Sequence, residues 1–273
     1  MKEISKHQIK IFDIVIPFVV FVMIITSGCQ HPGQISPNWQ NEEQKNLKVY
    51  ANLGPEFRNL TLSVREVAAL DEQTLLVGGS YLRSTGDPVR SVLLRSTDGG
   101  KTWQDTDVWL TGFNTWRIFV LDKKHAFAAV NYSIEGNLAP FVIFGTNDGG
   151  VTWHRSEQDL PFEHIGIPMG MDFSFASPEY GQFWIVGSFG VKHYYTTTDG
   201  GRTWKLSYVA ENWPDGESFD CKYERDWENN RVLISLRSPH GPDKYKTVSI
   251  LNTKYTLDEQ GNIIPAALDD GIQ

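Results

Sequence analysis

Three aspartates recur at near-constant spacing along this 273-residue chain, and carboxylates commonly act as acids or bind metal ions in proteins. Asp98, Asp148 and Asp199 are 50 and 51 residues apart, and each precedes two glycines. Acid or metal chemistry would require the three carboxylates to converge on one site. A period of this size instead indicates repeated supersecondary units, with one aspartate in each repeat. We therefore expect the three aspartates to be structural.

A nine-residue motif surrounds each of these aspartates and predicts a tight hairpin. It reads "RSTDGGKTW" at 95–103, "GTNDGGVTW" at 145–153 and "TTTDGGRTW" at 196–204. Glycine supplies positive φ, and the aspartate side chain can accept bonds from the turn amides. The tryptophan can bury a large apolar area against a neighbouring sheet. The motif is thus predicted to hold the repeats together.

These residues resemble the Asp-box, or BNR, repeat of sialidase-like β-propellers, whose pattern is Ser or Thr, any residue, Asp, any, Gly, any, Thr, Trp. The resemblance implies that each box lies on the hairpin between the third and fourth strands of a propeller blade. It also implies that the aspartate ties up turn amides and the tryptophan packs between blades. The residues that fill the pattern are Ser96, Asp98, Gly100, Thr102, Trp103, Thr146, Asp148, Gly150, Thr152, Trp153, Thr197, Asp199, Gly201, Thr203 and Trp204.

Runs rich in Val, Ile, Phe and Tyr surround the boxes and predict an all-β fold, a small β-propeller of about four four-stranded blades. The last module, at 217–261, has no box and is expected to close on the run "KYTLDEQG". The segment at 47–53 is expected to pair with this last blade and close the ring. A fifth blade would result if 59–64 belonged to a degenerate extra module.

The first 28 residues predict export and a lipid anchor. Three lysines precede an apolar run at 14–25, which is shorter than the roughly 20 residues of a membrane-spanning helix. The basic, apolar, small-residue order is typical of a secretory signal, and "TSGC" resembles a bacterial lipobox, although Thr26 replaces its usual Leu, Val or Ile. The resemblance implies that Cys29 is acylated. The alternative is an ordinary signal peptide with an incidental cysteine.

The chain is therefore predicted to be a lipoprotein of a bacterial cell envelope, facing the periplasm from the outer membrane if the cell is Gram-negative. If Cys29 carries lipid, Cys221 has no disulfide partner and is expected to be a buried apolar side chain. The predicted segments are a signal peptide at 1–28, a flexible tether at 29–46, a β-propeller domain at 47–265 and a C-terminal tail at 266–273.

Charge and composition limit the classes of partner. The formal net charge is −8 and 40% of the residues are hydrophobic, so the chain can bury a core but lacks a basic surface for nucleic acid. His154 and His164 are ten residues apart and are expected in loops rather than on one metal ion. We expect no cofactor, no bound metal and no membrane contact except through the lipid.

A candidate binding face follows from propeller geometry. Loops between second and third strands, and loops between blades, share the face opposite the boxes. Aromatic residues interleaved with charges there are typical of protein or glycan contact surfaces. Alternatively, Trp109 and Trp213 only anchor their own loops. The candidate residues are Tyr81, Arg83, Asp87, Trp109, Tyr132, Glu135, Glu163, His164, Trp213, Asp215, His240 and Asp243.

No catalytic residue is predicted. A sialidase would need an arginine triad, a Tyr–Glu pair, an acid Asp and an Arg-Ile-Pro motif, yet Arg117 and Ile118 are followed by Phe119. We therefore expect a non-catalytic protein-binding propeller that acts as a scaffold or assembly factor in the envelope. The alternatives are an immunity lipoprotein that neutralises a toxin, and a sialidase-like glycoside hydrolase or glycan binder.

Overall fold

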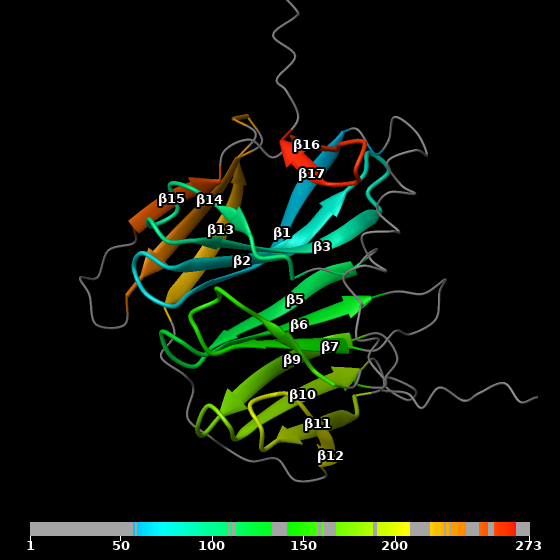
Figure 1. The fold of residues 1–273 in the computed structure, drawn as a ribbon, viewed down its shortest axis with the longest axis vertical. Coiled ribbons are helices and arrows are strands. Elements are labelled where there is room, and N and C mark those ends of the chain that lie inside the picture. Colours follow the sequence, from blue (N-terminus) through cyan, green and yellow to red (C-terminus); the bar gives the residue numbers. More distant parts are fainter. Residues whose placement is uncertain are drawn as a thin grey trace, which may run out of the picture. The chain divides into compact units, whose positions relative to one another are not determined.

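The computed structural model describes residues 57, 59–108, 110, 113–132, 141–157, 160, 168–187, 190–207, 219–226, 228–229, 231–238, 246–250 and 254–265. These residues form seventeen β-strands in four antiparallel sheets (Figure 1). The predicted all-β class is confirmed. Within the described part of the chain, no helix is long and apolar enough to cross a membrane.

The first sheet contains the first repeat and a hairpin from the end of the chain. Its strand order is β17-β16-β1-β2-β3-β4. Buried and half-exposed residues alternate at the start of β1, as expected of a strand with one face in a core. The bounds are β1 (Leu60–Ala69), β2 (Leu75–Leu82), β3 (Pro88–Ser96), β4 (Gln104–Asp105), β16 (Lys254–Leu257) and β17 (Ile263–Pro265).

The second and third sheets are four-stranded meanders, as predicted for propeller blades. In both, each strand pairs with the next along the chain, and the fourth strand follows the Asp-box turn. The second sheet comprises β5 (Phe113–Val120), β6 (Ala126–Tyr132), β7 (Phe141–Thr146) and β8 (His154–Arg155). The third comprises β9 (Pro168–Phe175), β10 (Gly181–Gly187), β11 (Lys192–Thr197) and β12 (Lys205–Ser207).

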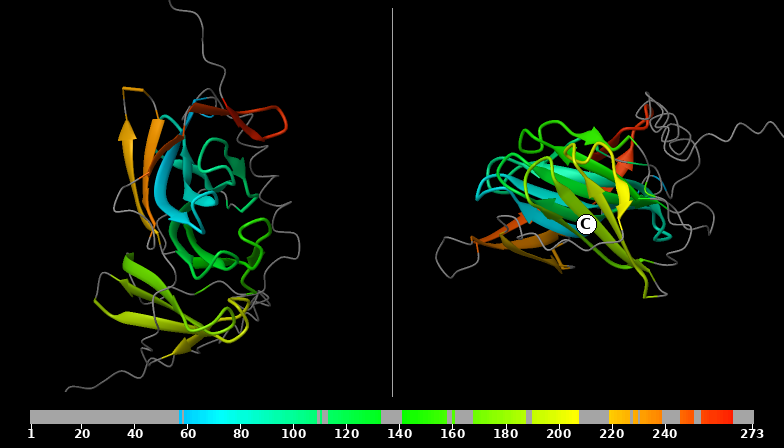
Figure 2. Two further views of the ribbon diagram at one scale, coloured as in Figure 1. Left: turned by 90° about the vertical axis from the view of Figure 1, so that its left-hand side faces the viewer. Right: turned by 90° about the horizontal axis from the view of Figure 1, so that it is seen from below.

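The last sheet departs from the four-stranded pattern. Its described strands are β13 (Asp220–Asp226), β14 (Arg231–Arg237) and β15 (Lys246–Ile250). The run expected as its fourth strand is β16, which instead pairs with the start of β1, beside which it lies in Figure 2. Residues 60–64, in the segment considered for an extra blade, are the first half of β1. The expected closing segment at 47–53 lies outside the described residues.

Three hydrophobic clusters join neighbouring sheets. One packs Leu62 and Val77 of the first sheet against Ile234 of the last sheet. A second joins the first and second sheets, and a third joins the second and third. The third is largely aromatic, and the rings of Phe127 and Phe175 stack with centroids 3.9 Å apart. Burial of this apolar area supplies the main force that holds the sheets together.

The last sheet packs against the first with reversed strand polarity. The hydroxyl of Tyr223 donates to the Arg65 carbonyl at 3.2 Å, and Arg225 Nη1 donates to the Leu62 carbonyl at 2.6 Å. Rising residue numbers on β13 therefore match falling numbers on β1, so the two strands are antiparallel. In the first and second sheets, by contrast, the Asp-box ends lie at the same side, because Arg95 donates to the Gly149 carbonyl.

Candidate functional site

Each Asp-box aspartate is occupied by its own turn. The Asp98 carboxylate accepts hydrogen bonds from Ser96 Oγ, from the amides of Lys101 and Thr102, and from Thr102 Oγ1 at 2.6 Å. The bonds from Thr102 and its neighbours hold the pKa of Asp98 well below its usual range. Asp148 repeats these contacts, and Asp199 accepts bonds from Thr203 and Thr197. Their acceptor sites are thus used within the hairpins.

The box of the second sheet also connects two sheets. The Gly149 amide donates to the Lys124 carbonyl at 2.9 Å, which ties the box to the first turn of its own sheet. Arg95 Nε of the first sheet donates to the Gly149 carbonyl at 2.8 Å. Gly150 has a φ of +82°, and a Cβ there would lie only 3.3 Å from Leu76 of the first sheet. The box therefore fastens neighbouring sheets.

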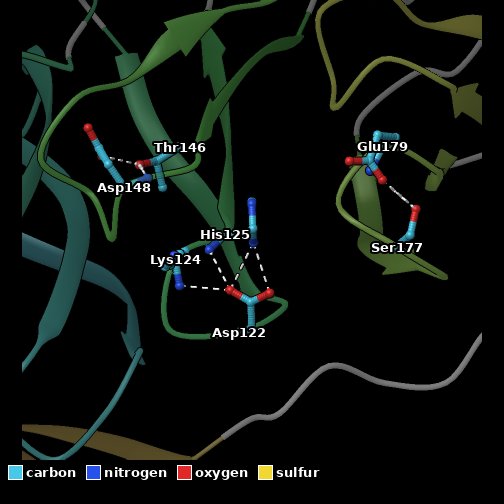
Figure 3. Close-up of polar contacts among 7 residues, drawn as sticks. All are labelled: Asp122, Lys124, His125, Thr146, Asp148, Ser177 and Glu179. Atoms are coloured by element: carbon cyan, nitrogen blue, oxygen red, sulfur yellow. Dashed lines mark hydrogen bonds and ion pairs between the residues drawn. The ribbon is translucent and has the colours of Figure 1, made fainter.

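A second repeated turn supports the boxes, and sequence reasoning missed it. Asp122 Oδ1 accepts bonds from the Lys124 and His125 amides at 2.7 and 2.8 Å (Figure 3). Asp71 and Ser177 accept equivalent amide bonds in the first and third sheets. The recurrence of "LDEQT" and "LDKKH", at 70–74 and 121–125, could have revealed this turn.

The box tryptophans pack at the junctions between sheets. In each box, the tryptophan indole Nε1 donates to the carbonyl of the second glycine after the aspartate. The distances are 3.1, 3.2 and 3.0 Å for Trp103, Trp153 and Trp204. Trp204 is only 1% exposed and belongs to the cluster between the second and third sheets. Trp103 and Trp153 are partly buried against the other two clusters.

The described members of the predicted binding face differ in their surroundings. Tyr81 is only 3% exposed and packs edge-on against Tyr255, so it is part of the core. Arg83 pairs with Asp87 at 3.0 Å and lies over the Phe57 ring. Tyr132 ends β6. The predicted residues outside the described part are Cys29, Trp109, Glu135, Glu163, His164, Trp213, Asp215, His240 and Asp243.

A cavity of about 400 Å³ lies where three strands of three different sheets approach one another. Its walls come from the last four residues of β1, the last four of β5 and the residues at the start of β13. These ends of β1 and β5 lead into the turns that support the boxes. The cavity thus lies toward the box side, whereas the predicted binding face is on the opposite side. Its lining is Glu66, Val67, Ala68, Ala69, Arg117, Ile118, Phe119, Val120, Phe219, Asp220 and Cys221.

Three charged side chains meet beside this cavity. Glu66, Arg117 and Asp172 each lie three residues before the end of β1, β5 and β9, respectively. The ladders of β1 and β5 shift register just before Glu66 and Arg117. Such bulges re-aim side chains, and they occur here at equivalent places in two repeats. Equivalent positions in three sheets therefore converge on one point.

Arg117 joins the two carboxylates. Its Nη1 donates to Glu66 Oε1 at 2.7 Å, while Nε and Nη2 contact Asp172 at 2.9 and 3.2 Å, a bidentate pair. Burial raises the pKa of Glu66 to about 7, and the charge of Asp172 adds to this effect although Arg117 opposes it. Burial opposes the charge of Arg117, but its bonds to Asp172 and Glu66 raise its pKa overall. Arg117 therefore stays charged.

Chemically, this arrangement can bind a polar group or exchange a proton. A carboxyl group with a pKa near 7 beside a second carboxylate is a common feature of acid–base sites. Cys221 lines the cavity, and burial raises its thiol pKa to about 12, so it is no nucleophile at neutral pH. Among the described residues, no three His, Cys, Asp or Glu side chains are grouped to hold a metal ion.

Sequence reasoning considered Arg117 only as a failed sialidase motif and singled out neither Glu66 nor Asp172. A charged residue inside a strand ordinarily indicates a solvent-facing position. The available signal was positional, because all three charges precede the first turn of their repeats by the same number of residues.

The sequence profile of the BNR/Asp-box repeat matches residues 94–105 and 195–206, around the first and third boxes. No curated protein matches the chain. Among solved structures, NanB sialidase from Streptococcus pneumoniae is 15% identical with a TM-score of 0.33, and covers 64% of this chain and 28% of its own. The GH93 α-L-arabinofuranosidase of Fusarium graminearum is 16% identical with a TM-score of 0.36. This match covers 69% of this chain and 61% of the arabinofuranosidase chain.

A GH43_1 enzyme from Xanthomonas citri is 10% identical with a TM-score of 0.31, covering 76% of this chain and 80% of its own. The chain thus spans less than a third of the NanB chain and about three fifths of the arabinofuranosidase. Similarity at this level does not transfer an activity, since one fold hosts many functions. The function must be argued from the cavity.

Proposed function

We propose that this chain is a lipid-anchored, non-catalytic protein-binding module, and that the cavity between β1, β5 and β13 is its site. The observation that carries the proposal is the internal pairing of the cavity charges. Arg117 engages both Glu66 and Asp172, so the charged groups are pre-positioned by one another. Fixed, paired charges around a cavity suit recognition of a partner group.

The same pairing argues against a catalytic role. A general acid or nucleophile needs an oxygen within hydrogen-bond reach of the reacting atom. One oxygen of Glu66 and both oxygens of Asp172 are already bonded to the guanidinium. The Asp-box carboxylates are used in their own turns. A scaffold or assembly factor in the envelope, or an inhibitor of a toxin, requires only binding.

One observation favours a second candidate, a glycoside hydrolase. Glycosidases use two carboxyl groups, one with a raised pKa that acts as the acid. The pKa of Glu66 is raised to about 7, and Asp172 lies across the same arginine. In this candidate, Glu66 would be the acid and Asp172 the second carboxylate.

Turnover and partner capture separate the two candidates. We expect the purified full-length chain to hydrolyse no glycoside in a fluorogenic panel, and to retain one protein partner from an envelope extract. Mass spectrometry of that partner would distinguish an envelope component from a toxin. Turnover that is lost in both Glu66→Gln and Asp172→Asn, with unchanged melting temperatures, would establish the hydrolase instead.

The lipid anchor has its own test. Cys29→Ser should move the protein from the membrane fraction to the soluble fraction, because acyl chains supply the attachment in the proposal. Cell fractionation with metabolic labelling by a radioactive fatty acid would follow both effects. Ser27→Thr is a matched control outside the acylated position. Continued membrane association of an unlabelled Cys29→Ser protein would contradict the proposal.

A further inference from the structure

The edge of β1 that faces away from β2 already accepts hydrogen bonds from side chains of the last sheet. Arg225 donates to the Leu62 carbonyl, and Tyr223 donates to the Arg65 carbonyl. Ser63, in contrast, directs its carbonyl toward β2, where a Cβ on Gly79 would lie 1.9 Å from that oxygen. Leu62 and Arg65 share this edge although they are three residues apart, because the register of β1 shifts between Val64 and Glu66. Backbone groups otherwise alternate direction along a strand, so Val67, two residues after Arg65, presents its carbonyl on the same edge. Val67 is part of the cavity wall.

The cavity wall is rich in hydrogen-bond acceptors. Its lining includes Glu66 and Asp220, which carry carboxylates, and Val67, whose carbonyl points away from β2. Arg117 is the positive group in the lining, and it is shared between Glu66 and Asp172. The ion pair of Asp220 with Arg237 is 3.5 Å long, and the two side chains are 38% and 45% exposed, so water partly screens it. The lining thus carries more negative than positive charge.

Apolar surface completes the wall. Ala68, Ile118, Phe119 and Phe219 line the same cavity. A long cationic side chain buries its aliphatic stem on such a surface while its charged end reaches polar groups. Phenylalanine faces also attract cations directly. The combination suits an organic cation with a hydrocarbon stem better than a small inorganic ion.

Resting on the proposed protein-binding function, we propose that this cavity receives the guanidinium group of an arginine side chain presented by the partner. A guanidinium is planar and offers five donors, which match a carboxylate and neighbouring carbonyl oxygens. Arg225 provides an internal precedent, since its guanidinium bonds a β1 carbonyl at 2.6 Å along the same edge.

The test titrates the full-length chain with butylguanidinium, and separately with butylurea, a neutral molecule of similar shape. Calorimetry should detect binding of the cation but not of the urea. Glu66→Gln should weaken cation binding at pH 8 by at least about tenfold, because a charged acceptor is lost. Glu224→Gln is the matched control, because it removes an exposed carboxylate of β13 that does not line the cavity. It should bind like the wild type.

The pH dependence supplies a second readout. Arg117, Asp172, Asp220 and Cys221 face Glu66 from β5, β9 and β13, and Glu66 has a pKa of about 7. A cation favours the ionised form, so binding expels a proton from Glu66. Affinity should therefore rise about tenfold between pH 6 and pH 8, following the ionised fraction. Glu66→Gln should remove this rise.

Several outcomes would overturn the inference. These are equal binding of butylurea, equal affinities of the Glu66→Gln and Glu224→Gln proteins, and an affinity independent of pH in the wild type. Capture of a protein partner that butylguanidinium does not release would also overturn it, while leaving the proposed function intact. Failure to capture any protein, with the cation still bound, would count against the proposed function itself.

Discussion

Replacing Arg117 with methionine is expected to lower the free energy of unfolding by about 2 to 4 kcal/mol. The substitution keeps much of the apolar stem but leaves Glu66 and Asp172 near each other without the shared cation. Removal of one partner from a buried ion pair commonly costs about 3 to 5 kcal/mol. We lower that range because Arg117 and Asp172 are each 35% exposed, so water screens part of the repulsion.

Urea unfolding at pH 8 and at pH 5 would measure this effect. The folded-state pKa of Glu66, about 7, lies above its ordinary value of 4.5, so folding favours the protonated form of this carboxyl group. The stability that the protonated carboxyl group contributes is present below pH 4.5 and is lost as pH rises through 7. The decrease in unfolding free energy caused by Arg117→Met should therefore be smaller at pH 5. Adding Glu66→Gln to the Arg117→Met protein should partly restore its stability. Arg202→Met, at an exposed arginine, is the control. Equal stabilities of the two methionine variants would contradict the prediction.

The Asp-box hairpins were predictable from the sequence because their chemistry is local. In the first box, Ser96, Asp98 and Thr102 bond to one another and to amides within five residues. Glycine at two successive turn positions is required by positive φ, which is 69° at Gly99 and 87° at Gly100. Such short-range constraints can be recognised without knowing the rest of the fold.

The partner of β16 was not predictable in this way. The run 254–257 has the composition of a strand, and only three residues separate it from β15. Strand propensity, however, does not specify which edge a strand joins. β16 pairs with Leu60 and Thr61 of β1, which are almost 200 residues away in the chain. The pairing of β16 depends on a long-range contact, which the local sequence pattern does not indicate.

The charge cluster beside the cavity was hidden for a related reason. Glu66, Arg117 and Asp172 are 51 and 55 residues apart, and each alone resembles an exposed charge on a strand. Only the register of three sheets, together with bulges in β1 and β5, brings them together. Comparison of equivalent repeat positions could have suggested the cluster, but not that one arginine bonds both carboxylates.

The box tryptophans differ in burial, and their substitutions should differ accordingly. Trp204→Ala is expected to lower the free energy of unfolding by about 3 to 5 kcal/mol, since it empties a fully buried site. The indole contacts Phe173, Phe175 and Phe183, with ring centroids 6.2 to 6.3 Å away. Its loss would also leave the Gly201 carbonyl without the indole donor. Trp153→Ala should cost less, because Trp153 is only partly buried.

Denaturant unfolding of both alanine variants would test this order, and Trp204→Phe would separate packing from hydrogen bonding. Phenylalanine keeps an aromatic ring against Phe175 but cannot donate to Gly201. The unfolding free energy of Trp204→Phe should therefore lie between those of the wild type and Trp204→Ala. Binding of butylguanidinium by the folded fraction should be unchanged, since Trp204 does not line the cavity. A Trp204→Ala protein as stable as wild type would mean that the second and third sheets do not depend on this junction. Loss of cation binding without loss of stability would instead place the box in the binding site, contrary to its role as a fastening between sheets.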